Sequence, residues 1–174
     1  MRGQPVVVAR DVLSVVVECG DWTGCDDEGC VQRVSQQGLL YRLEVFKTRT
    51  RGWGVRSWDT IPCGALVCVF WGTVFRHKLA GTLPFDDDTY FFDCAVRLDV
   101  GDDHRALPAG QQRTDIESEY AIDAKHAGGV ARFINHSCNP NLYVQPLCVG
   151  HADRTMCGIG LFAGMPIPAW TELT

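Results

Sequence analysis

Short stretches of alternating or continuous apolar residues, separated by turn residues, run through the chain and predict strands rather than long helices. Residues Tyr41–Lys47 alternate apolar and polar side chains, as a half-buried strand does. Residues Ala65–Trp71 form a continuous apolar run that includes β-branched residues and ends at Gly72. Further strands are predicted at Tyr90–Asp93, Glu119–Asp123, Leu142–Val149 and Met156–Ala163. The pattern therefore predicts a mainly β architecture of many short strands.

Three regions depart from this strand pattern. Gly129–Asn135 has no alternation and predicts one or two helical turns. Leu83–Glu119 is rich in Asp, Gly and Gln, which predicts one or two surface loops around a strand. The final residues, Trp170–Thr174, are strand-like and are followed by no turn or polar tail, so the chain is expected to be truncated or degenerate.

Composition narrows the class of protein. The 174 residues are 46% hydrophobic and 21% charged, which excludes disorder, collagen and coiled coil and suits one globular domain. The longest apolar runs, such as Leu13–Val17, are far shorter than a membrane helix, so no membrane partner is expected. A net charge of −5 argues against a general nucleic-acid binder, and no direct nucleic-acid contact is expected.

Nine cysteines, an odd number without a secretory signal, argue against a disulfide framework. Cys19, Cys25 and Cys30 lie in the polar segment CGDWTGCDDEGC, and this spacing suits thiolates that converge on zinc. A closed site needs a fourth ligand, and none lies nearby in sequence, so a loop with incidental thiols is the alternative. The remaining cysteines sit in or beside apolar runs and are predicted to be small buried residues: Cys63, Cys68, Cys94, Cys148 and Cys157.

Two segments carry candidate chemistry. The first, KTRTRGWGVR from Lys47, brackets a tryptophan with glycines, so that the backbone can approach a ligand while the indole face attracts cations. The second, RFINHSCNPN from Arg132, gathers Asn, His, Ser and Cys side chains. We expect the side chains of His136 and Cys138 to point to opposite faces of the chain, which argues against a cysteine-protease dyad. A fixed polar turn that binds a ligand is the better interpretation.

Together, in this order, the two segments resemble those of SET-domain protein-lysine methyltransferases, above all the branch that methylates lysine 9 of histone H3. The resemblance runs from about Cys19 to the end of the chain. Plant-type members look closest, particularly in EVFKT, RSWD and TELT. The matching stretches are LEVFKTRTRGWGVRSWDTIPCG, TYFFD, YAIDAKHAGGVARFINHSCNPNLYVQP and LFAGMPIPAWTELT.

The resemblance implies a β-clip-like SET fold of short curved sheets, few short helices and a knot-like C-terminal segment. In the knot-like arrangement, the NHSC segment is tucked beneath a neighbouring loop. It implies a remnant of a pre-SET cysteine-rich segment at 1–38 and a SET domain at 39–174. It also implies S-adenosylmethionine as cofactor. By motif position, the cofactor-binding residues would be Arg51, Gly52, Trp53, Tyr90, Arg132, Phe133, Asn135 and His136.

The implied reaction is methyl transfer to a protein lysine on a basic histone tail, in the nucleus and on chromatin. The lysine must arrive as a neutral amine, so positioning and desolvation would do most of the work. Tyr90 and Phe70 are the candidate catalytic residues: Phe70 would line the lysine channel, and Tyr90 would lie beside the cofactor site. Phe70 stands where the family carries a tyrosine, so the ring is kept and its hydroxyl is lost.

Other departures concern metal ligands and the end of the chain. Cys19, Cys25 and Cys30 match the last ligands of the family's three-zinc cluster, whereas Thr23 replaces another ligand. Cys138 matches a zinc ligand whose partners in the family follow the SET domain. The family's second channel tyrosine would follow Thr174.

Two alternatives therefore stand beside the enzyme: a non-catalytic SET-fold module that binds chromatin or a peptide, and a small zinc-binding interaction protein.

Overall fold

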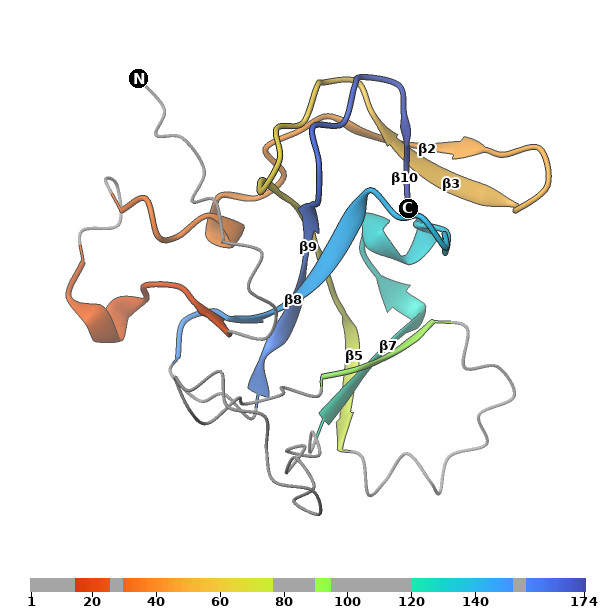
Figure 1. Ribbon diagram of the computed structural model, residues 1–174. Helices are drawn as coiled ribbons and strands as arrows, with labels where there is room; N and C mark the ends of the chain where they lie inside the picture. Colours follow the sequence, from red (N-terminus) through yellow and green to blue (C-terminus); the bar gives the residue numbers. More distant parts are fainter. Residues whose placement is uncertain (1–14, 26–29, 77–89, 95–119, 152–155) are drawn as a thin grey trace, which may run out of the picture.

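The computed structural model describes residues 15–25, 30–76, 90–94, 120–151 and 156–174 (Figure 1). Ten strands are assigned there: β1 (Val16–Val17), β2 (Leu43–Lys47), β3 (Trp53–Ser57), β4 (Leu66–Phe70), β5 (Gly72–Arg76), β6 (Phe91–Asp93), β7 (Tyr120–Gly128), β8 (Leu142–Cys148), β9 (Gly158–Ala163) and β10 (Glu172–Leu173). Three 3₁₀ turns lie wholly within these ranges: η1 (Asp21–Thr23), η2 (Ser35–Gln37) and η3 (Val130–Phe133). None of these turns is long or apolar enough to cross a bilayer. The mainly β expectation is confirmed.

The strands form three small sheets rather than one large sheet. Their orders are β1-β8-β9-β4, β10-β3-β2 and β5-β7-β6. Only the β1–β8 pair is parallel among the described pairings, and it joins Val16 to Leu147 and Val17 to Cys148. The segment that precedes the SET-like motifs is thus hydrogen-bonded directly into the largest sheet.

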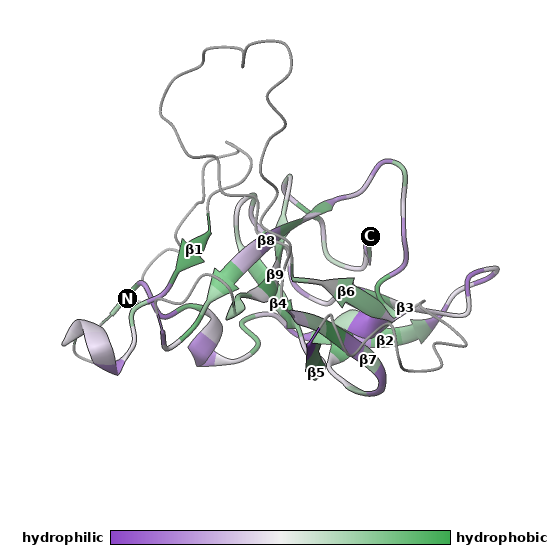
Figure 2. Ribbon diagram, turned by 90° about the horizontal axis from the view of Figure 1, so that it is seen from below, coloured by the Kyte–Doolittle hydropathy of each residue, from purple (hydrophilic) through white to green (hydrophobic). Residues whose placement is uncertain are grey.

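The core lies where the three sheets meet. Val55 from β3, Val67 from β4, Ile159 from β9 and Leu173 from β10 are almost completely buried in one cluster. Figure 2 shows apolar strand ribbons in the centre of the molecule, whereas the turn between β2 and β3 is hydrophilic. Removing this apolar surface from water stabilises the arrangement at about 25 cal/mol per Å².

Most predicted strands are present, with bounds that differ by a few residues. β7 continues to Gly128, five residues beyond the predicted end at Asp123, and Gly128 pairs with Gly72 at the start of β5. β1, β3 and β5 are strands that the sequence patterns did not predict. The predicted loop region, Leu83–Glu119, lies almost entirely outside the described residues.

Four of the five cysteines that were predicted to be buried are buried, and one is not. Cys68, Cys94, Cys148 and Cys157 are buried, whereas Cys63 is exposed. Cys63 lies in the turn before β4, where its Sγ is 3.5 Å from the carbonyl oxygen of Gly164. The prediction was wrong for Cys63 because the neighbouring apolar run begins two residues later, at Ala65. Burial raises the pKa of the Cys68 thiol to about 12.

Candidate functional site

A tight turn at the tip of the β2–β3 hairpin presents the first predicted segment. Thr48 closes the turn, because its backbone N–H and its hydroxyl both donate to the carbonyl oxygen of Gly52, at 2.8 and 3.0 Å. Gly52 has φ +69°, a left-handed conformation that favours glycine. The turn leaves the Trp53 side chain 53% exposed, with the Lys47 ammonium 5.0 Å from the centre of the indole ring. The turn therefore presents an accessible indole face that already binds a cation.

The second predicted segment is hydrogen-bonded to this turn. The Arg51 guanidinium donates to the carbonyl oxygen of His136 at 2.9 Å, and the Asn135 side-chain amide donates to the carbonyl oxygen of Trp53 at 2.8 Å. These bonds join residues 85 and 82 positions apart. Arg51, Trp53, Asn135 and His136, which were selected from motif position, are therefore direct neighbours.

Glu172 joins the same group, although the sequence reasoning did not select it. Its carboxylate accepts hydrogen bonds from Arg51 at 2.9 Å and from Asn135 at 3.1 Å. Its backbone carbonyl accepts a third bond, at 2.7 Å, from the side chain of Asn141. The signal that could have found it is an acidic residue inside a short strand, next to the fully buried Leu173.

The end of the chain is held against the second segment. The backbone N–H groups of Asn141 and Leu142 both donate to the carbonyl oxygen of Thr174, at 3.0 and 2.9 Å. In return, the Thr174 N–H donates to the Asn141 side-chain oxygen at 3.0 Å. These bonds fix β10 beside the second segment, Arg132–Asn141, which we call the polar turn. They also place Glu172 next to the β2–β3 hairpin.

Tyr90, Arg132 and Phe133 form a second group. The Arg132 guanidinium carbon lies 4.8 Å from the centre of the Tyr90 ring and 5.1 Å from that of Phe133. One Arg132 nitrogen donates to the carbonyl oxygen of Lys125 at 2.5 Å. The buried Arg132 Nε has no hydrogen-bond partner within the described ranges. Arg132 is thus held between two aromatic rings with one donor left over.

Phe70 lies in the aromatic part of the core. Its ring centre is 5.4 Å from that of Phe92, and only 9% of the residue is exposed. Tyr90, Phe92 and Phe133 are partly buried and pack against the same cluster. The two candidate catalytic residues, Phe70 and Tyr90, therefore contribute to one apolar, aromatic region.

His136 and Cys138 do not point apart. The Cys138 sulfur lies 3.8 Å from His136 Nε2, at a bend in the chain. The bend includes a hydrogen bond from the Asn139 N–H to the Ser137 hydroxyl at 3.2 Å. Our expectation of opposite faces was wrong for this pair, because only successive side chains of an extended chain alternate, and those two positions apart lie on the same face. Among the described residues, however, no third side chain is hydrogen-bonded to the His136 ring to orient it, and both residues are exposed.

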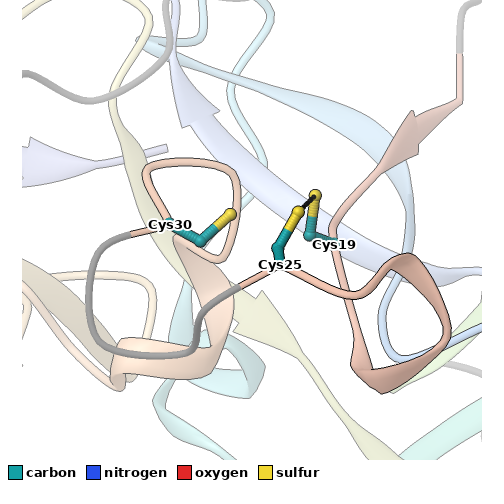
Figure 3. Close-up of side chains that lie close together, drawn as sticks. All are labelled: Cys19, Cys25 and Cys30. Atoms are coloured by element: carbon teal, nitrogen blue, oxygen red, sulfur yellow. Dashed lines mark hydrogen bonds between the residues drawn. The ribbon is translucent and has the colours of Figure 1, made fainter.

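The three N-terminal cysteines converge. The Sγ atoms of Cys19, Cys25 and Cys30 all lie within 4.8 Å of one another, and those of Cys19 and Cys25 are 3.5 Å apart (Figure 3). Two sulfurs bound to one tetrahedral zinc at 2.3 Å would lie about 3.8 Å apart. The geometry therefore suits a soft metal. Cys138 is not a member of this group among the residues described.

Neighbouring side chains influence the ionisation of this cysteine group. A side-chain hydrogen bond with Thr23, followed by one with Cys19, lowers the pKa of Cys25. The hydrogen bond with Cys25, followed by burial, raises the pKa of Cys19. Cys25 is thus the thiol of this pair that ionises more readily, and the thiolate is the form that binds metal.

A buried carboxylate supports the cysteine loop. Glu18 is only 3% exposed, and it accepts hydrogen bonds from the Ser35 N–H and hydroxyl, both at 2.7 Å. The Gln36 side chain donates to Glu18 at 3.1 Å and to the carbonyl oxygen of Cys19 at 2.8 Å. Figures 1 and 2 both place this N-terminal segment on the opposite side of the molecule from the β2–β3 hairpin. The cysteine group and the hairpin group are therefore separate sites.

Curated proteins similar to this chain are histone-lysine methyltransferases. The H3 lysine-9 specific enzyme SUVH4 of Arabidopsis thaliana is 38% identical over 180 residues, which cover 97% of this chain and 28% of that protein. The H3 lysine-9 specific enzyme of Schizosaccharomyces pombe is 37% identical over 171 residues, covering 96% and 31%. The chain spans less than a third of the length of these relatives.

Solved structures match in the same way. KRYPTONITE in complex with mCHH DNA, an H3(1–15) peptide and SAH has a TM-score of 0.70 and 38% identity, covering 92% of this chain and 28% of that chain. Arabidopsis thaliana SUVH6 in complex with SAM has a TM-score of 0.73 and 37% identity, covering 90% and 31%. The SET domain family matches residues 52–174. Because that match covers most of the chain, the protein belongs to the SET-domain family.

Proposed function

We propose that this chain carries the core of a histone-lysine methyltransferase, which transfers a methyl group from S-adenosylmethionine to a lysine of histone H3. The observation that carries this proposal is the pair of hydrogen bonds from Arg51 to His136 and from Asn135 to Trp53, which join the two motif segments at one place. The names of the relatives, and the SAM, SAH and H3 peptide in their complexes, give the substrate class.

The residues fit the cofactor in two respects. S-adenosylmethionine bears a sulfonium cation, and the exposed Trp53 indole already holds the Lys47 ammonium on its face. The cofactor also carries a carboxylate, and the unpartnered Arg132 Nε is a cationic donor in the second segment. In the proposed site, Arg51, Gly52 and Trp53 would bind from the hairpin, and Arg132, Phe133, Asn135 and His136 from the polar turn. Tyr90 would lie beside Arg132.

The chemistry that the bound cofactor supplies is an activated methyl group, open to in-line displacement by an amine. The protein must then align a lysine and favour its neutral form. Phe70 and Tyr90 belong to an apolar, aromatic region, and such a region lowers the pKa of a lysine ammonium. Phe70 supplies apolar surface without the hydrogen bond that a tyrosine hydroxyl would give to the amine.

A non-catalytic peptide-binding module is the second candidate, and the Phe70 side chain favours it. The ring is buried against Phe92, and no hydroxyl at this position can orient the amine. Such a module would keep the fold and bind the cofactor or the histone tail without turnover.

Methylation of H3 peptides with labelled cofactor separates these candidates. The enzyme proposal expects turnover by the unaltered chain and faster turnover by Phe70→Tyr, which regains the hydroxyl. Phe46→Tyr is the matched control, because the Phe46 ring lies on β2 against the Arg56 guanidinium. We expect this variant to turn over at the rate of the unaltered chain. Cofactor binding without turnover by either protein would favour the module.

For the cysteine group we propose one bound zinc, held by Cys19, Cys25 and Cys30. The fit rests on three sulfurs within 4.8 Å of one another and on the chemistry of thiolate donors. The metal would be structural, since the cysteine loop is tied through Gln36 to the buried Glu18. Cys138 would belong to a different zinc site, if its other ligands come from chain that follows Thr174.

The remaining proposals concern organisation and location. We keep the division into a pre-SET remnant at 1–38 and a SET domain at 39–174, and a place on chromatin in the nucleus follows from histone as substrate. The absence of nucleic-acid contact is no longer proposed, because the related KRYPTONITE complex includes DNA. A net charge of −5 is therefore not a sufficient reason to exclude nucleic-acid contact.

A further inference from the structure

Glu172 reaches the hairpin site from the strand at the end of the chain. β10 pairs with β3 in antiparallel register, with Glu172 opposite Arg56 and Leu173 opposite Val55. Leu173 is completely buried, so the strand is anchored on its other face. The Glu172 side chain, which is 25% exposed, points toward the hairpin turn and the polar turn.

One carboxylate bridges the two motif segments. Oε2 accepts from Arg51 Nη2 at 2.9 Å, and Oε1 accepts from Asn135 Nδ2 at 3.1 Å. Each of these donors also bonds the backbone of the opposite segment, Arg51 at His136 and Asn135 at Trp53. Glu172 therefore fixes the rotamers of the two side chains that join the segments.

The second glycine of the Gly-Trp-Gly bracket makes room for this carboxylate. A Cβ at Gly54 would lie 3.1 Å from Glu172 Oε1 and 2.8 Å from the Thr48 methyl carbon. Gly54 has no left-handed φ, so its backbone conformation does not demand glycine. The close approach of Glu172 and Thr48 is a physical reason for glycine at this position.

We propose that Glu172 is a positioning residue for the cofactor site, acting through Arg51 and Asn135 rather than by contact with the cofactor. This inference rests on the proposed function. Without the carboxylate, each donor keeps a single backbone acceptor, and both side chains gain rotamer freedom. Because Arg51 and Glu172 are 44% and 25% exposed, solvent screens the pair. We expect Glu172→Gln to weaken S-adenosylhomocysteine binding about five- to tenfold.

The same sheet offers a matched control. Arg56 and Glu44 form an ion pair at 2.7 Å with similar exposure, and neither touches the hairpin turn or the polar turn in the described contacts. Glu44→Gln thus removes a comparable surface charge pair from the β2–β3 hairpin. A merely structural role for Glu172 predicts that the two variants behave alike.

The test combines two measurements on the full chain. Calorimetric titration with S-adenosylhomocysteine should show weaker binding for Glu172→Gln and unchanged binding for Glu44→Gln. Hydrogen exchange without cofactor should show faster exchange of the amides of residues 48–54 in Glu172→Gln alone. The exchange measurement is independent of the proposed function.

The outcomes are distinguishable. Exchange and affinity that match Glu44→Gln would overturn the positioning role and leave the proposed function intact. Equal loss of affinity in Glu172→Gln and Glu44→Gln would also overturn it. No binding by the unaltered chain would overturn the proposed function, and with it the role of Glu172 at a cofactor site. Glu172→Asp keeps the charge on a shorter side chain, and we expect it to restore only part of the affinity.

Discussion

The Arg51 guanidinium lies 2.9 Å from the Glu172 carboxylate, a contact between residues 121 positions apart. The same guanidinium donates to the His136 carbonyl, so one arginine fork connects the hairpin turn, the polar turn and the last strand. A planar fork with several fixed donors makes both bonds at once, which a lysine ammonium does with less geometric control.

Arg51→Lys should therefore weaken the proposed cofactor site more than it weakens the fold. We expect roughly a fivefold loss of affinity for S-adenosylhomocysteine, with a change in the free energy of unfolding below about 1 kcal/mol because the ion pair is exposed. Calorimetry and denaturant unfolding measure the two effects. Arg49→Lys, at an exposed position in the same turn, is the control. Equal losses in both variants would contradict the role of Arg51.

Zinc binding should depend on Cys25 and not on Cys63. The unaltered chain, purified with zinc, should contain about one equivalent, because three thiolates converge in one place. Cys25→Ser should lower that content strongly, whereas Cys63→Ser, at an exposed cysteine outside the group, should not. Elemental analysis gives the stoichiometry. Absence of zinc from the unaltered chain under these conditions would exclude the site.

Substitutions at Trp170 should show that the backbone is strained at this position. It is the non-glycine residue of the described chain with a left-handed φ, +68°, and its indole is 53% exposed. Its ring contacts Trp58 at 5.1 Å and the Arg56 guanidinium at 5.2 Å. Trp170→Ala loses these contacts and keeps the strain, whereas Trp170→Gly also relieves the strain.

Trp170→Gly should accordingly be more stable than Trp170→Ala by about 1 kcal/mol, close to the usual cost of a left-handed residue. Thermal or denaturant unfolding of the two variants gives the difference directly. An alanine variant as stable as the glycine variant would show that φ at this position relaxes when the ring is removed.

The ion pair between Arg42 and Asp59 should contribute to stability only above acidic pH. Hydrogen bonds from Arg42 lower the pKa of Asp59 from 3.8 to about 2 in the folded protein. A lowered folded-state pKa adds stability that is fully present above the unfolded-state pKa and is lost as pH falls toward the folded-state pKa. The contribution should therefore fade between about pH 4 and pH 2. The melting temperatures of the unaltered chain and Asp59→Asn should converge over that range, and a constant difference would contradict the assignment.

The sequence pattern predicted the strands whose apolar residues are continuous or regular. Ala65–Trp71 became β4 with bounds one residue shorter at each end, because a short continuous run of apolar, mostly buried residues is typical of a core strand. β3 was missed because Gly52, Trp53 and Gly54 read as a turn. Pairing with both β2 and β10 places Trp53 and Gly54 in a central strand instead, a tertiary effect that local preference does not contain.

Motif position selected residues that the fold brings together, such as Arg51 and Asn135, and missed Glu172. The position of Glu172 depends on how β10 pairs with β3 and on the space that Gly54 leaves for its carboxylate. Neither the strand pairing nor this close approach can be read from one sequence. The His136–Cys138 contact was missed for a different reason, because side chains two positions apart share a face even in an extended chain.

Cofactor binding by the unaltered chain and by Asn135→Ala tests the central claim most directly. Asn135 joins the two motif segments through Trp53 and also contacts Glu172, while the exposed Asn139 of the same segment serves as the control position. In calorimetric titrations with S-adenosylmethionine, we predict one site per chain, binding at least tenfold weaker for Asn135→Ala, and unchanged binding for Asn139→Ala. No detectable binding to the folded, unaltered chain, or equal binding by all three proteins, would contradict the claim that these segments form the cofactor site.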